Sequence, residues 1–541
     1  MITEATLFDS KSHTKQIYIS PSEAATMIGV STATIHNWIK TGYLLAHEKK
    51  VNLASVEDFI CHTAGIEKLN TRANKQKKSP NNYEEISHSV EKWLATSTTD
   101  IEKLYEKALS ESFRNKEGIY YTPETIVEDM MRNVPITENT TFLDPCCGGG
   151  NFIMAAIKRG IKPENIFGFD TDRNAVAITR KRIFEATGYD SKQIVQEDFL
   201  KKADKLEKRF DWIFTNPPWG KKMPKTEKNK YATIYQSGNS NDTCSLFLCA
   251  SLQLLKEDGW MGFLMPEAFF NITTFEDSRK KILNYKILRL TDYKKPFKGL
   301  MTRAQSVILQ NTQATDDTIY CQYEGKHFFR TIASFRKTPK TILNFQTDGQ
   351  AAEIISHIYN KEHSTLSKNT KWGLGIVTGN NKKWCKPTPE NETVPVYRGQ
   401  DISPNNLKEP SLFIPKDMSS FQQVAPLPLY QAKEKLIYRF ISSKLVFFCD
   451  TKQRYILNSA NMLILEDNFP LSGQQLTDLL NSRFMNWMFE NIFHTHKVLQ
   501  SDLEALPIFA EYFQTHPVFH EKSYLAYLNI EEENGTYRIK K

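Results

Sequence analysis

Between about residues 140 and 310, short apolar runs alternate with stretches that have helical spacing. The runs are, in order, TTFLD, IFGFD, QIVQED, DWIFTN, WMGFLMP, KILRLTDY and AQSVILQ. Strands that alternate with helices are typical of a doubly wound sheet whose strands are mostly parallel. The pattern therefore predicts an α/β domain with a seven-stranded, mostly parallel sheet, whose ligands would bind at the carboxyl ends of the strands.

The pattern changes on both sides of this region. Residues 17–60 divide into short helices. The segment LNTRANKQKKSPNN, residues 69–82, has almost no apolar content and is typical of a basic linker, and a helical spacing follows it. Beyond residue 310, short strands mix with helices over residues 474–492 and 501–506, which predicts an α+β domain.

The helices within residues 17–60 follow a recognisable plan. Ser20 and Glu23 make a capping box, with Pro21 at the first helical position. Gly29 ends that helix, and Ser31 caps a second one. A helix, a turn with glycine and a second helix form the helix-turn-helix pattern.

This segment resembles the DNA-binding domains of the MerR and excisionase type, in which the phrase S-x-x-E-A-A-x-x-I-G-V-S-x-x-T-I-x-x-W recurs. The resemblance implies that the second helix faces DNA through Thr32, Thr34, His36 and Asn37. The alternative interpretation is a helical module that contacts another protein.

Length and composition support a protein of several domains. At roughly 150 residues per domain, 541 residues predict three or four domains. A content of 40% hydrophobic and 24% charged residues is typical of a globular chain and excludes a collagen-like or low-complexity one. The 70 basic and 62 acidic residues leave a net charge of 70 − 62 = +8, which favours a polyanionic partner.

Cysteine usage and the N-terminus predict a cytoplasmic protein. The eight cysteines include no CxxC pair and no cluster with histidine at zinc-ligand spacing, so neither a disulfide framework nor a metal site is expected. The segment MITEATLFDSKSHTK lacks the apolar core of a signal peptide. The most apolar stretch, residues 246–255, is too short to span a bilayer, so no membrane association is expected.

A glycine-rich turn follows the first predicted strand of the α/β region. Asp144 ends the apolar run, and Pro145 and Cys147 lead into the glycines at 148–150, just ahead of a helix. Glycines there let the backbone approach a ligand closely, and amides at a helix N-terminus favour an anionic group. The spacing differs from the GxGxxG fingerprint of dinucleotide-binding domains.

The phrase DWIFTNPPWG, residues 211–220, is the most specific one in the chain. Its strand runs into Asn216, Pro217, Pro218 and Trp219, a rigid turn that holds an amide oxygen and neighbouring carbonyls in place. An exocyclic amino nitrogen is a poor nucleophile because its lone pair is delocalised into the ring. If Asn216 and the Pro217 carbonyl each accept one of its hydrogens, the lone pair can turn toward a methyl donor.

Together, the phrases DPCCGGGNF, QEDF and NPPW resemble the motifs of S-adenosylmethionine-dependent amino-methyltransferases. The upstream phrase GIYYTPE resembles their motif X, and the order of the motifs is that of the gamma class of DNA adenine methyltransferases, the TaqI-like group. The resemblance covers about residues 105–510. It implies a Rossmann-like methyltransferase domain followed by a target recognition domain.

The resemblance also implies the cofactor S-adenosylmethionine and a site for it. Asp144 and the backbone after it would hold the methionine part, and Asp170, with Asp172 as the competing candidate, would accept hydrogen bonds from the ribose hydroxyls. Asp198 would accept one from the adenine amino group, and Thr122 would cap the helix after the Tyr-Thr-Pro turn. The residues implied to bind the cofactor are Tyr121, Thr122, Pro123, Asp144, Pro145, Cys147, Gly148, Gly150, Phe152, Asp170, Asp198 and Phe199.

On the target side, Phe297 matches the aromatic residue that stacks on the extruded base opposite Trp219. The implied catalytic set is Asn216, Pro217, Pro218, Trp219 and Phe297. A lysine-rich insertion follows the turn, and Lys221, Lys222 and Lys225 would contact DNA phosphates beside the base. The alternative for this insertion is a disordered surface loop.

The sequence therefore predicts a DNA methyltransferase that flips adenine out of the duplex and methylates its amino nitrogen, as the modification component of a restriction-modification system. A cognate endonuclease would be a separate chain. The alternatives are a methyltransferase for RNA bases or protein glutamine, and a DNA-binding regulator with an inactive methyltransferase fold. The expected parts are residues 1–66 (helix-turn-helix), 67–83 (linker), 84–310 (catalytic) and 311–541 (target recognition).

Overall fold

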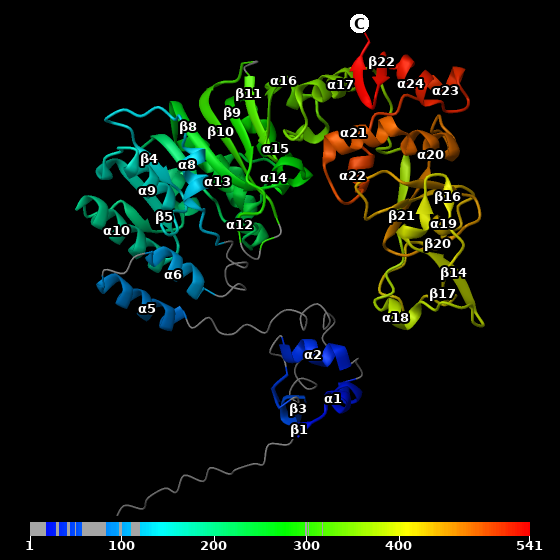
Figure 1. The fold of residues 1–541 in the computed structure, drawn as a ribbon, viewed down its shortest axis with the longest axis horizontal. Helices are drawn as coiled ribbons and strands as arrows, with labels where there is room; N and C mark the ends of the chain where they lie inside the picture. The colour runs from blue at the N-terminus through cyan, green and yellow to red at the C-terminus, as the bar shows by residue number, and fades with distance from the viewer. Residues whose placement is uncertain are drawn as a thin grey trace, which may run out of the picture. The chain divides into compact units, whose positions relative to one another are not determined.

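The computed structural model describes residues 18–28, 32–40, 44–48, 50–56, 83–96, 100–109, 119–297, 300, 302–315 and 318–540. The chain falls into two compact units, residues 1–119 and 120–541 (Figure 1). The functional boundaries expected at residues 66, 83 and 310 stay predictions.

The first unit contains two short helices where the sequence predicts them. Its described elements are β1 (Tyr18–Ile19), α1 (Pro21–Ile28), α2 (Thr32–Lys40), β2 (Ala46–His47), β3 (Lys50–Asn52), α5 (Tyr83–Ala95) and α6 (Ile101–Ala108). The predicted capping box is confirmed, because the backbone N–H of Ser20 donates to Glu23 at 2.7 Å and that of Glu23 donates to the Ser20 hydroxyl at 3.2 Å. Ile35 and Trp38 of α2 are buried against α1 and β3, while Gly29 and Ser31 lie outside the described residues.

A three-stranded antiparallel sheet in the order β1-β3-β2 accompanies these helices. The sequence did not predict it, because its strands are only two or three residues long. Whether the two helices bind DNA as a helix-turn-helix stays a prediction.

A nine-stranded mixed sheet forms the centre of the second unit, in the order β12-β11-β9-β10-β8-β7-β4-β5-β6. The strands are β4 (Phe142–Asp144), β5 (Ile166–Asp170), β6 (Ile194–Gln196), β7 (Phe210–Thr215), β8 (Leu255–Pro266), β9 (Tyr285–Asp292), β10 (Ala304–Gln313), β11 (Thr318–Tyr323) and β12 (Lys326–Thr331). The five strands from β8 to β6 in this order are mutually parallel, and β10 is antiparallel to both β8 and β9. Each of the seven predicted runs forms a strand, β4 to β10.

The prediction of seven strands is wrong by two, because the sheet continues beyond residue 310. β11 pairs parallel to β9, and β12 pairs antiparallel to β11. β11 has only two buried residues and β12 only one, and β12 lies at the sheet edge. They lack the continuous apolar run of a central strand, so the sequence pattern did not distinguish them from the irregular region that follows.

Helices pack on this sheet and on one another. They are α8 (Glu124–Met130), α9 (Asn151–Lys158), α10 (Arg173–Thr187), α11 (Phe199–Lys202), α12 (Lys225–Tyr235), α13 (Thr243–Leu254), α14 (Ala268–Asn271), α15 (Glu276–Ile282), α16 (Ile332–Arg336) and α17 (Gly349–Tyr359). Nearly every residue of α13 is buried, because it packs between β8 and α12. The lysine-rich insertion forms α12, so the alternative of a disordered loop is wrong: Tyr231 and Tyr235 anchor one face of this helix in the core.

The C-terminal part mixes small sheets with helices, as predicted. The elements are β13 (Thr370–Leu374), α18 (Asn381–Trp384), β14 (Thr393–Tyr397), β15 (Ile402–Ser403), β16 (Asn406–Leu407), β17 (Leu412–Pro415), α19 (Leu427–Tyr430), β18 (Lys435–Arg439), β19 (Phe447–Asp450), β20 (Tyr455–Ile456), β21 (Ala460–Leu465), α20 (Gly473–Asn481), α21 (Arg483–Phe493), α22 (Gln500–Leu503), α23 (Tyr512–Thr515), α24 (Glu521–Tyr527), β22 (Ile530–Glu533) and β23 (Thr536–Ile539). The single helix predicted over residues 474–492 is wrong. Ser482 is extended, with φ −63° and ψ 156°, and its hydroxyl caps α21, so α20 and α21 are separate helices.

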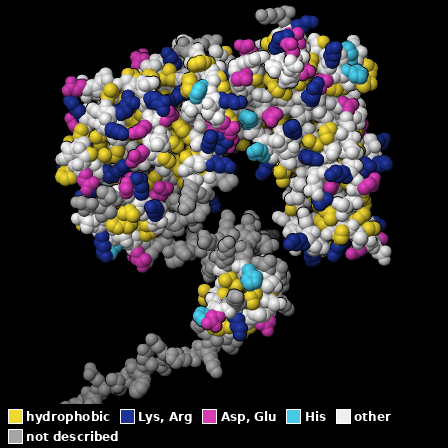
Figure 2. All heavy atoms as spheres, in the orientation of Figure 1, with side chains coloured by type: hydrophobic (Ala, Val, Ile, Leu, Met, Phe, Trp, Pro, Cys, Tyr) yellow, Lys and Arg dark blue, Asp and Glu magenta, His cyan; other side chains and the backbone are white. Residues whose placement is uncertain are grey.

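Charge is spread over the surface. Figure 2 shows Lys and Arg side chains scattered among Asp and Glu over the face drawn. Within the described part of the chain, no helix has the length and apolar character needed to cross a bilayer.

Candidate active site

The candidate site lies at the carboxyl ends of four parallel strands. Asp144 is the last residue of β4 and Asp170 the last of β5, while Asp198 and Asn216 follow β6 and β7. Because these strands are neighbours in the sheet, Asp144 and Asn216, which are 72 positions apart in the chain, are brought to one edge.

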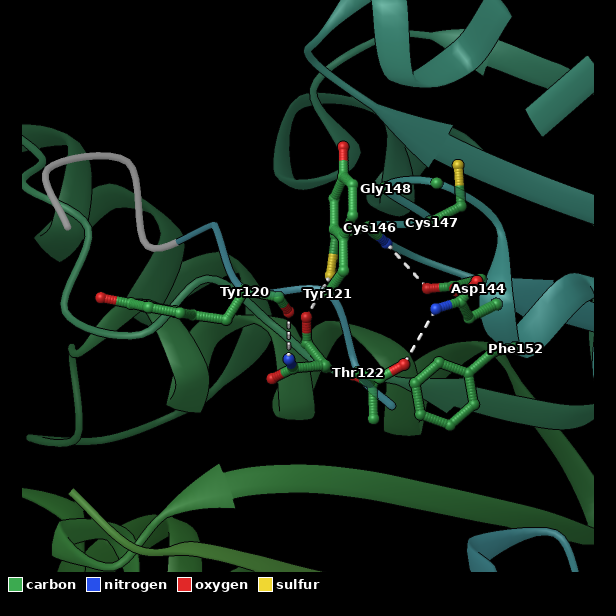
Figure 3. Close-up of a pocket in the computed structure, with 11 residues that line it drawn as sticks. Tyr120, Tyr121, Thr122, Asp144, Cys146, Cys147, Gly148 and Phe152 are labelled. Atoms are coloured by element: carbon green, nitrogen blue, oxygen red, sulfur yellow. Dashed lines mark hydrogen bonds between the residues drawn. The ribbon is translucent and has the colours of Figure 1, made fainter. Parts of the chain in front are cut away.

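The glycine-rich turn after β4 requires glycine at two positions. Gly148 and Gly150 have φ of +50° and +85°, in the left-handed region that favours glycine. A Cβ on Gly148 would lie 2.9 Å from Cε1 of Tyr121, and one on Gly150 would lie 2.9 Å from the Thr179 side chain. The turn therefore lets Tyr121 lie directly on the backbone of Gly148, as Figure 3 shows.

Asp144 is buried beneath this turn, with 1% of its surface exposed. One of its oxygens accepts hydrogen bonds from the Thr215 hydroxyl at 2.6 Å and from the Cys146 amide at 3.1 Å. Burial outweighs these bonds and raises the pKa of Asp144 to about 7. A cationic group bound next to this carboxylate would offset the cost of its burial.

Asp170 supports the same turn from β5. Its carboxylate accepts from the amides of Gly148 and Asp172, both at 2.9 Å, and burial raises its pKa to about 6. Asp172, the competing candidate, instead caps α10 by accepting from the Asn174 amide at 3.0 Å. The structure thus ties Asp170 to the glycine-rich turn and gives Asp172 the role of a helix cap.

Asp198 and Phe199 lie farther from the pocket wall. Asp198 caps α11 by accepting a hydrogen bond from the Leu200 amide at 3.1 Å. Its carboxylate also forms an ion pair with Lys201, whose Nζ is 3.8 Å away. Phe199 is buried and packs on Phe169, with ring centroids 5.6 Å apart. Neither lines the pocket of Figure 3, so their contact with an adenine ring stays a prediction.

This pocket lies between the glycine-rich turn and the segment before α8, and its space of about 300 Å³ is partly open to solvent. Among the predicted residues it brings together Tyr121, Thr122, Asp144, Cys147, Gly148, Phe152 and Asn216. Pro123, Pro145 and Gly150 are next to these residues in the chain but do not line it. Gly149, which the sequence analysis named only as part of the glycine-rich turn, also lines the pocket, and the residues that sequence reasoning missed are Tyr120, Cys146 and Asn151.

The predicted helix cap at Thr122 is wrong. α8 begins at Glu124 with Pro123 as its N-cap, and no side chain caps it. The carbonyl of Thr122 instead accepts from the side-chain amide of Asn151 at 2.9 Å, and Thr122 itself is buried. Asn151 thereby joins the two segments that enclose the pocket. Its place directly after three glycines was the signal that could have identified it.

Asn216 lies on the opposite wall of the pocket. Its side-chain nitrogen donates to the Tyr120 carbonyl at 2.9 Å, which fixes the amide orientation. The side-chain oxygen Oδ1 is therefore the atom that remains to accept a hydrogen bond from a ligand. Pro217 and Pro218 have no N–H, so the turn offers acceptors and no backbone donor at these positions.

Three aromatic rings are grouped beside Asn216. Trp219 and Phe297 meet edge to face, with centroids 5.3 Å apart and an angle of 83°, and Tyr120 lies 6.4 Å from Trp219 and 5.4 Å from Phe297. All three are buried, and the Trp219 indole donates to the Leu264 carbonyl at 3.2 Å. Figure 3 shows the Tyr120 side chain pointing away from the glycine-rich turn that Tyr121 covers. The two consecutive tyrosines therefore lie in different places: Tyr120 packs in the aromatic group, and Tyr121 covers the glycine-rich turn.

The residues predicted to contact DNA are distributed over both units. On α2, Thr32 and His36 are exposed and Thr34 is half-buried, whereas the side chain of Asn37 lies outside the described residues. In the second unit, Lys222 and Lys225 are exposed and Lys221 is half-buried. Exposure is compatible with DNA contact, which stays a prediction for each of them.

Comparison with known proteins agrees with these features. Residues 97–319 match the family model described as N-6 DNA Methylase, and residues 394–508 match the TaqI-like C-terminal specificity domain. The chain is 42% identical over 395 residues to the Type II methyltransferase M.VspI of Vibrio sp. (strain 343), covering 71% of this chain and 96% of that protein. It is 30% identical over 232 residues to the modification methylase CviBIII of Paramecium bursaria Chlorella virus NC1A, covering 42% and 57% of the two chains.

Among solved structures, the chain resembles the Type IIL restriction-modification enzyme MmeI, which was determined in complex with DNA. The TM-score is 0.50 at 13% identity, over 84% of this chain and 73% of that one. At this identity the likeness concerns the fold alone.

Proposed function

Because the chain belongs to the TaqI-like DNA adenine N6-methyltransferases, we propose that it methylates adenines flipped out of a specific DNA sequence, as the modification enzyme of a restriction-modification system. One observation carries the assignment of the site: Asn216, with its amide oxygen left to accept, lines the same pocket as Asp144 and the glycine-rich turn. A methyl donor and an amino group to be methylated can therefore meet there. The alternatives of an RNA-base or protein-glutamine methyltransferase, and of an inactive regulator, are not favoured.

The pocket residues fit S-adenosylmethionine. The buried carboxylate of Asp144, which lines the pocket, suits the cationic amino group of the methionine part. Asp170 does not line the pocket, but it holds the glycine-rich turn through the Gly148 amide, and its carboxylate suits the ribose hydroxyls. The absence of a Cβ at Gly148 leaves room for close approach along the turn. When bound, S-adenosylmethionine supplies an electrophilic methyl group.

The residues of the catalytic turn activate the target nitrogen. Oδ1 of Asn216 and the carbonyl of Pro217 each accept one hydrogen of the adenine amino group, which draws its lone pair out of conjugation with the ring. Trp219, Phe297 and Tyr120 provide the apolar surface on which the base stacks. Since Trp219 and Phe297 now touch edge to face, one ring must move to admit a base between them.

Sequencing that detects modified bases in DNA from a bacterial host expressing the chain tests this function. We expect N6-methyladenine at one recurring sequence. Modified cytosine in its place, or unmodified DNA from a host that makes the folded protein, would contradict the proposal. Digestion of the modified DNA with an endonuclease that cuts at the same sequence would show whether the modification protects against cleavage.

Base stacking is expected to depend on Trp219. With 2-aminopurine at the target position, fluorescence should change when the enzyme binds, and the change should shrink in Trp219→Ala, because stacking contributes roughly 1 to 3 kcal/mol per base. Trp260→Ala, on β8 and outside the aromatic group, is the matched control. If both variants behave alike, or if the fluorescence never changes, the base is not held by Trp219.

We further propose that the C-terminal domain reads the target sequence and that α2 adds contacts to the DNA. Replacing the exposed Thr32 and His36 by glutamate should repel DNA phosphates, weaken duplex affinity about tenfold and reduce its salt dependence, while the methylated sequence stays the same. Binding is measured by fluorescence anisotropy at several salt concentrations.

Met27→Glu, on the exposed face of α1, is the control for added charge. An altered or shorter methylated sequence in the α2 variant would show that α2 shares in target readout. If the α1 variant and the α2 variant lose equal amounts of duplex affinity, α2 has no specific role in DNA binding.

A further inference from the structure

Two of the four residues of the catalytic turn, Pro217 and Pro218, have no backbone amide that could help to hold the turn in place. We propose that the thiols of Cys146 and Cys244 are positioning residues that hold this turn through its carbonyls, so that the carbonyl of Pro217 is presented to the target amino group. This inference rests on the proposed function and adds to it the means by which the turn is oriented.

Cys146 holds the first carbonyl of the turn. Its Sγ lies 3.1 Å from the Asn216 carbonyl oxygen and 3.0 Å from the Thr215 hydroxyl. The Thr215 hydroxyl donates to Asp144, so its oxygen, like the Asn216 carbonyl, is an acceptor for the thiol hydrogen. Since the Cys146 amide also donates to Asp144, this one residue joins the cofactor carboxylate to the catalytic turn (Figure 3).

Cys244 holds the third carbonyl from a different element. It lies in the first turn of α13, and its Sγ is 3.7 Å from the Pro218 carbonyl oxygen. Asp242 caps α13 by accepting from the Cys244 amide at 3.0 Å, which fixes the start of the helix and the direction of the thiol. Cys244 is completely buried, so no water competes for this bond.

Both thiols keep their hydrogen at neutral pH. Burial raises the pKa of Cys146 and of Cys244 well above the ordinary thiol value, and nearby carboxylates, Asp144 for Cys146 and Asp242 for Cys244, raise it further. Neither side chain is therefore a nucleophile or a metal ligand here. Each thiol can therefore only donate a weak hydrogen bond and fill space between the packed elements.

The carbonyl between the two held ones is left for the substrate. Within the described part of the chain, no group donates a hydrogen bond to the Pro217 carbonyl, although Pro217 is buried. A buried carbonyl without a partner is unfavourable, and an incoming amino group would satisfy it. Anchoring both neighbours prevents the turn from rotating this carbonyl away.

The test compares single-turnover methyl transfer in the full-length protein, with labelled S-adenosylmethionine and a duplex that contains the methylated sequence. We expect Cys146→Ala and Cys244→Ala each to slow the chemical step about threefold to tenfold, the size expected for loss of one weak hydrogen bond. In Cys244→Ala, whose side chain lies outside the cofactor pocket, the affinity for S-adenosylmethionine, measured by calorimetry, should stay unchanged, as should the KM for DNA. Cys146→Ser, which keeps a donor, should restore most of the rate.

Cys249→Ala is the matched control, because Cys249 is equally buried in α13 and contacts no part of the turn. Its rate of methyl transfer should equal that of the wild type, although its melting temperature should fall about as much as in Cys146→Ala and Cys244→Ala. Wild-type rates in Cys146→Ala and Cys244→Ala, a Cys146→Ser variant as slow as Cys146→Ala, or a Cys249→Ala variant that is equally slow would each overturn the inference. If Cys244→Ala does not fold, the comparison of Cys146→Ala with Cys146→Ser decides. The proposed function is judged separately, by the activity of the wild type.

Discussion

Asn216→Ala is expected to lower the rate of methyl transfer by a factor of about 100 or more, with little change in the affinity for S-adenosylmethionine. The amide oxygen accepts a hydrogen bond that strengthens as the target nitrogen becomes positively charged, so its loss raises the barrier more than it weakens binding. The substitution also removes the bond from Asn216 to the Tyr120 carbonyl, which aligns the turn with the segment before α8. The measurement is transfer of a labelled methyl group under single-turnover conditions, with calorimetry of the cofactor.

Two further variants test whether the loss of activity is due to the acceptor oxygen of Asn216. Asn229→Ala removes an exposed amide on α12, outside the pocket, and should retain wild-type activity. Asn216→Asp keeps an acceptor oxygen but loses the donor to Tyr120, and should fall between alanine and the wild type. Turnover of Asn216→Ala within a few-fold of the wild type would rule out the mechanism.

Acidification from pH 8 to pH 5.5 is expected to weaken binding of S-adenosylmethionine by a factor on the order of 100. The reason is that Asp144 and Asp170 titrate with pKa values of about 7 and about 6, and both are proposed to bind the cofactor as carboxylates. Protonation removes the negative charge that suits the cationic amino group and one acceptor for the ribose. Calorimetric titrations across this range measure the change.

The stability of the free enzyme should change in the opposite direction. Both pKa values lie above the ordinary aspartate value of 3.8, so the folded state binds more protons than the unfolded state between about pH 4 and pH 7. The contribution of these groups to stability is therefore complete below about pH 4 and is lost as pH rises through about 7. In Asp170→Asn, the affinity for S-adenosylmethionine should depend less on pH around pH 6 than it does in the wild type. A wild-type affinity that is independent of pH would contradict the assignment of both aspartates to the cofactor.

The sequence was enough to predict much of the fold and the residues of the two turns at the site, because these features depend on the local pattern of side chains. The seven apolar runs became β4 to β10, since a strand buried on both faces requires a continuous apolar stretch. The absence of backbone donors at Pro217 and Pro218 follows from covalent structure, because proline has no N–H in any conformation. Gly148 and Gly150 could likewise be predicted, because a left-handed backbone favours glycine.

Only the tertiary structure decided which of several similar groups lie at the site. Tyr120 and Tyr121 are adjacent and chemically alike, yet one ring packs with Phe297 and the other covers Gly148. Asp170 supports the glycine-rich turn whereas Asp172 caps a helix, and the two cannot be told apart by spacing. The thiols of Cys146 and Cys244 reach carbonyls 70 and 26 residues away along the chain. Contacts of this kind depend on how strands and helices pack, and a local pattern of side chains carries no information about distances between segments that meet only in the folded chain.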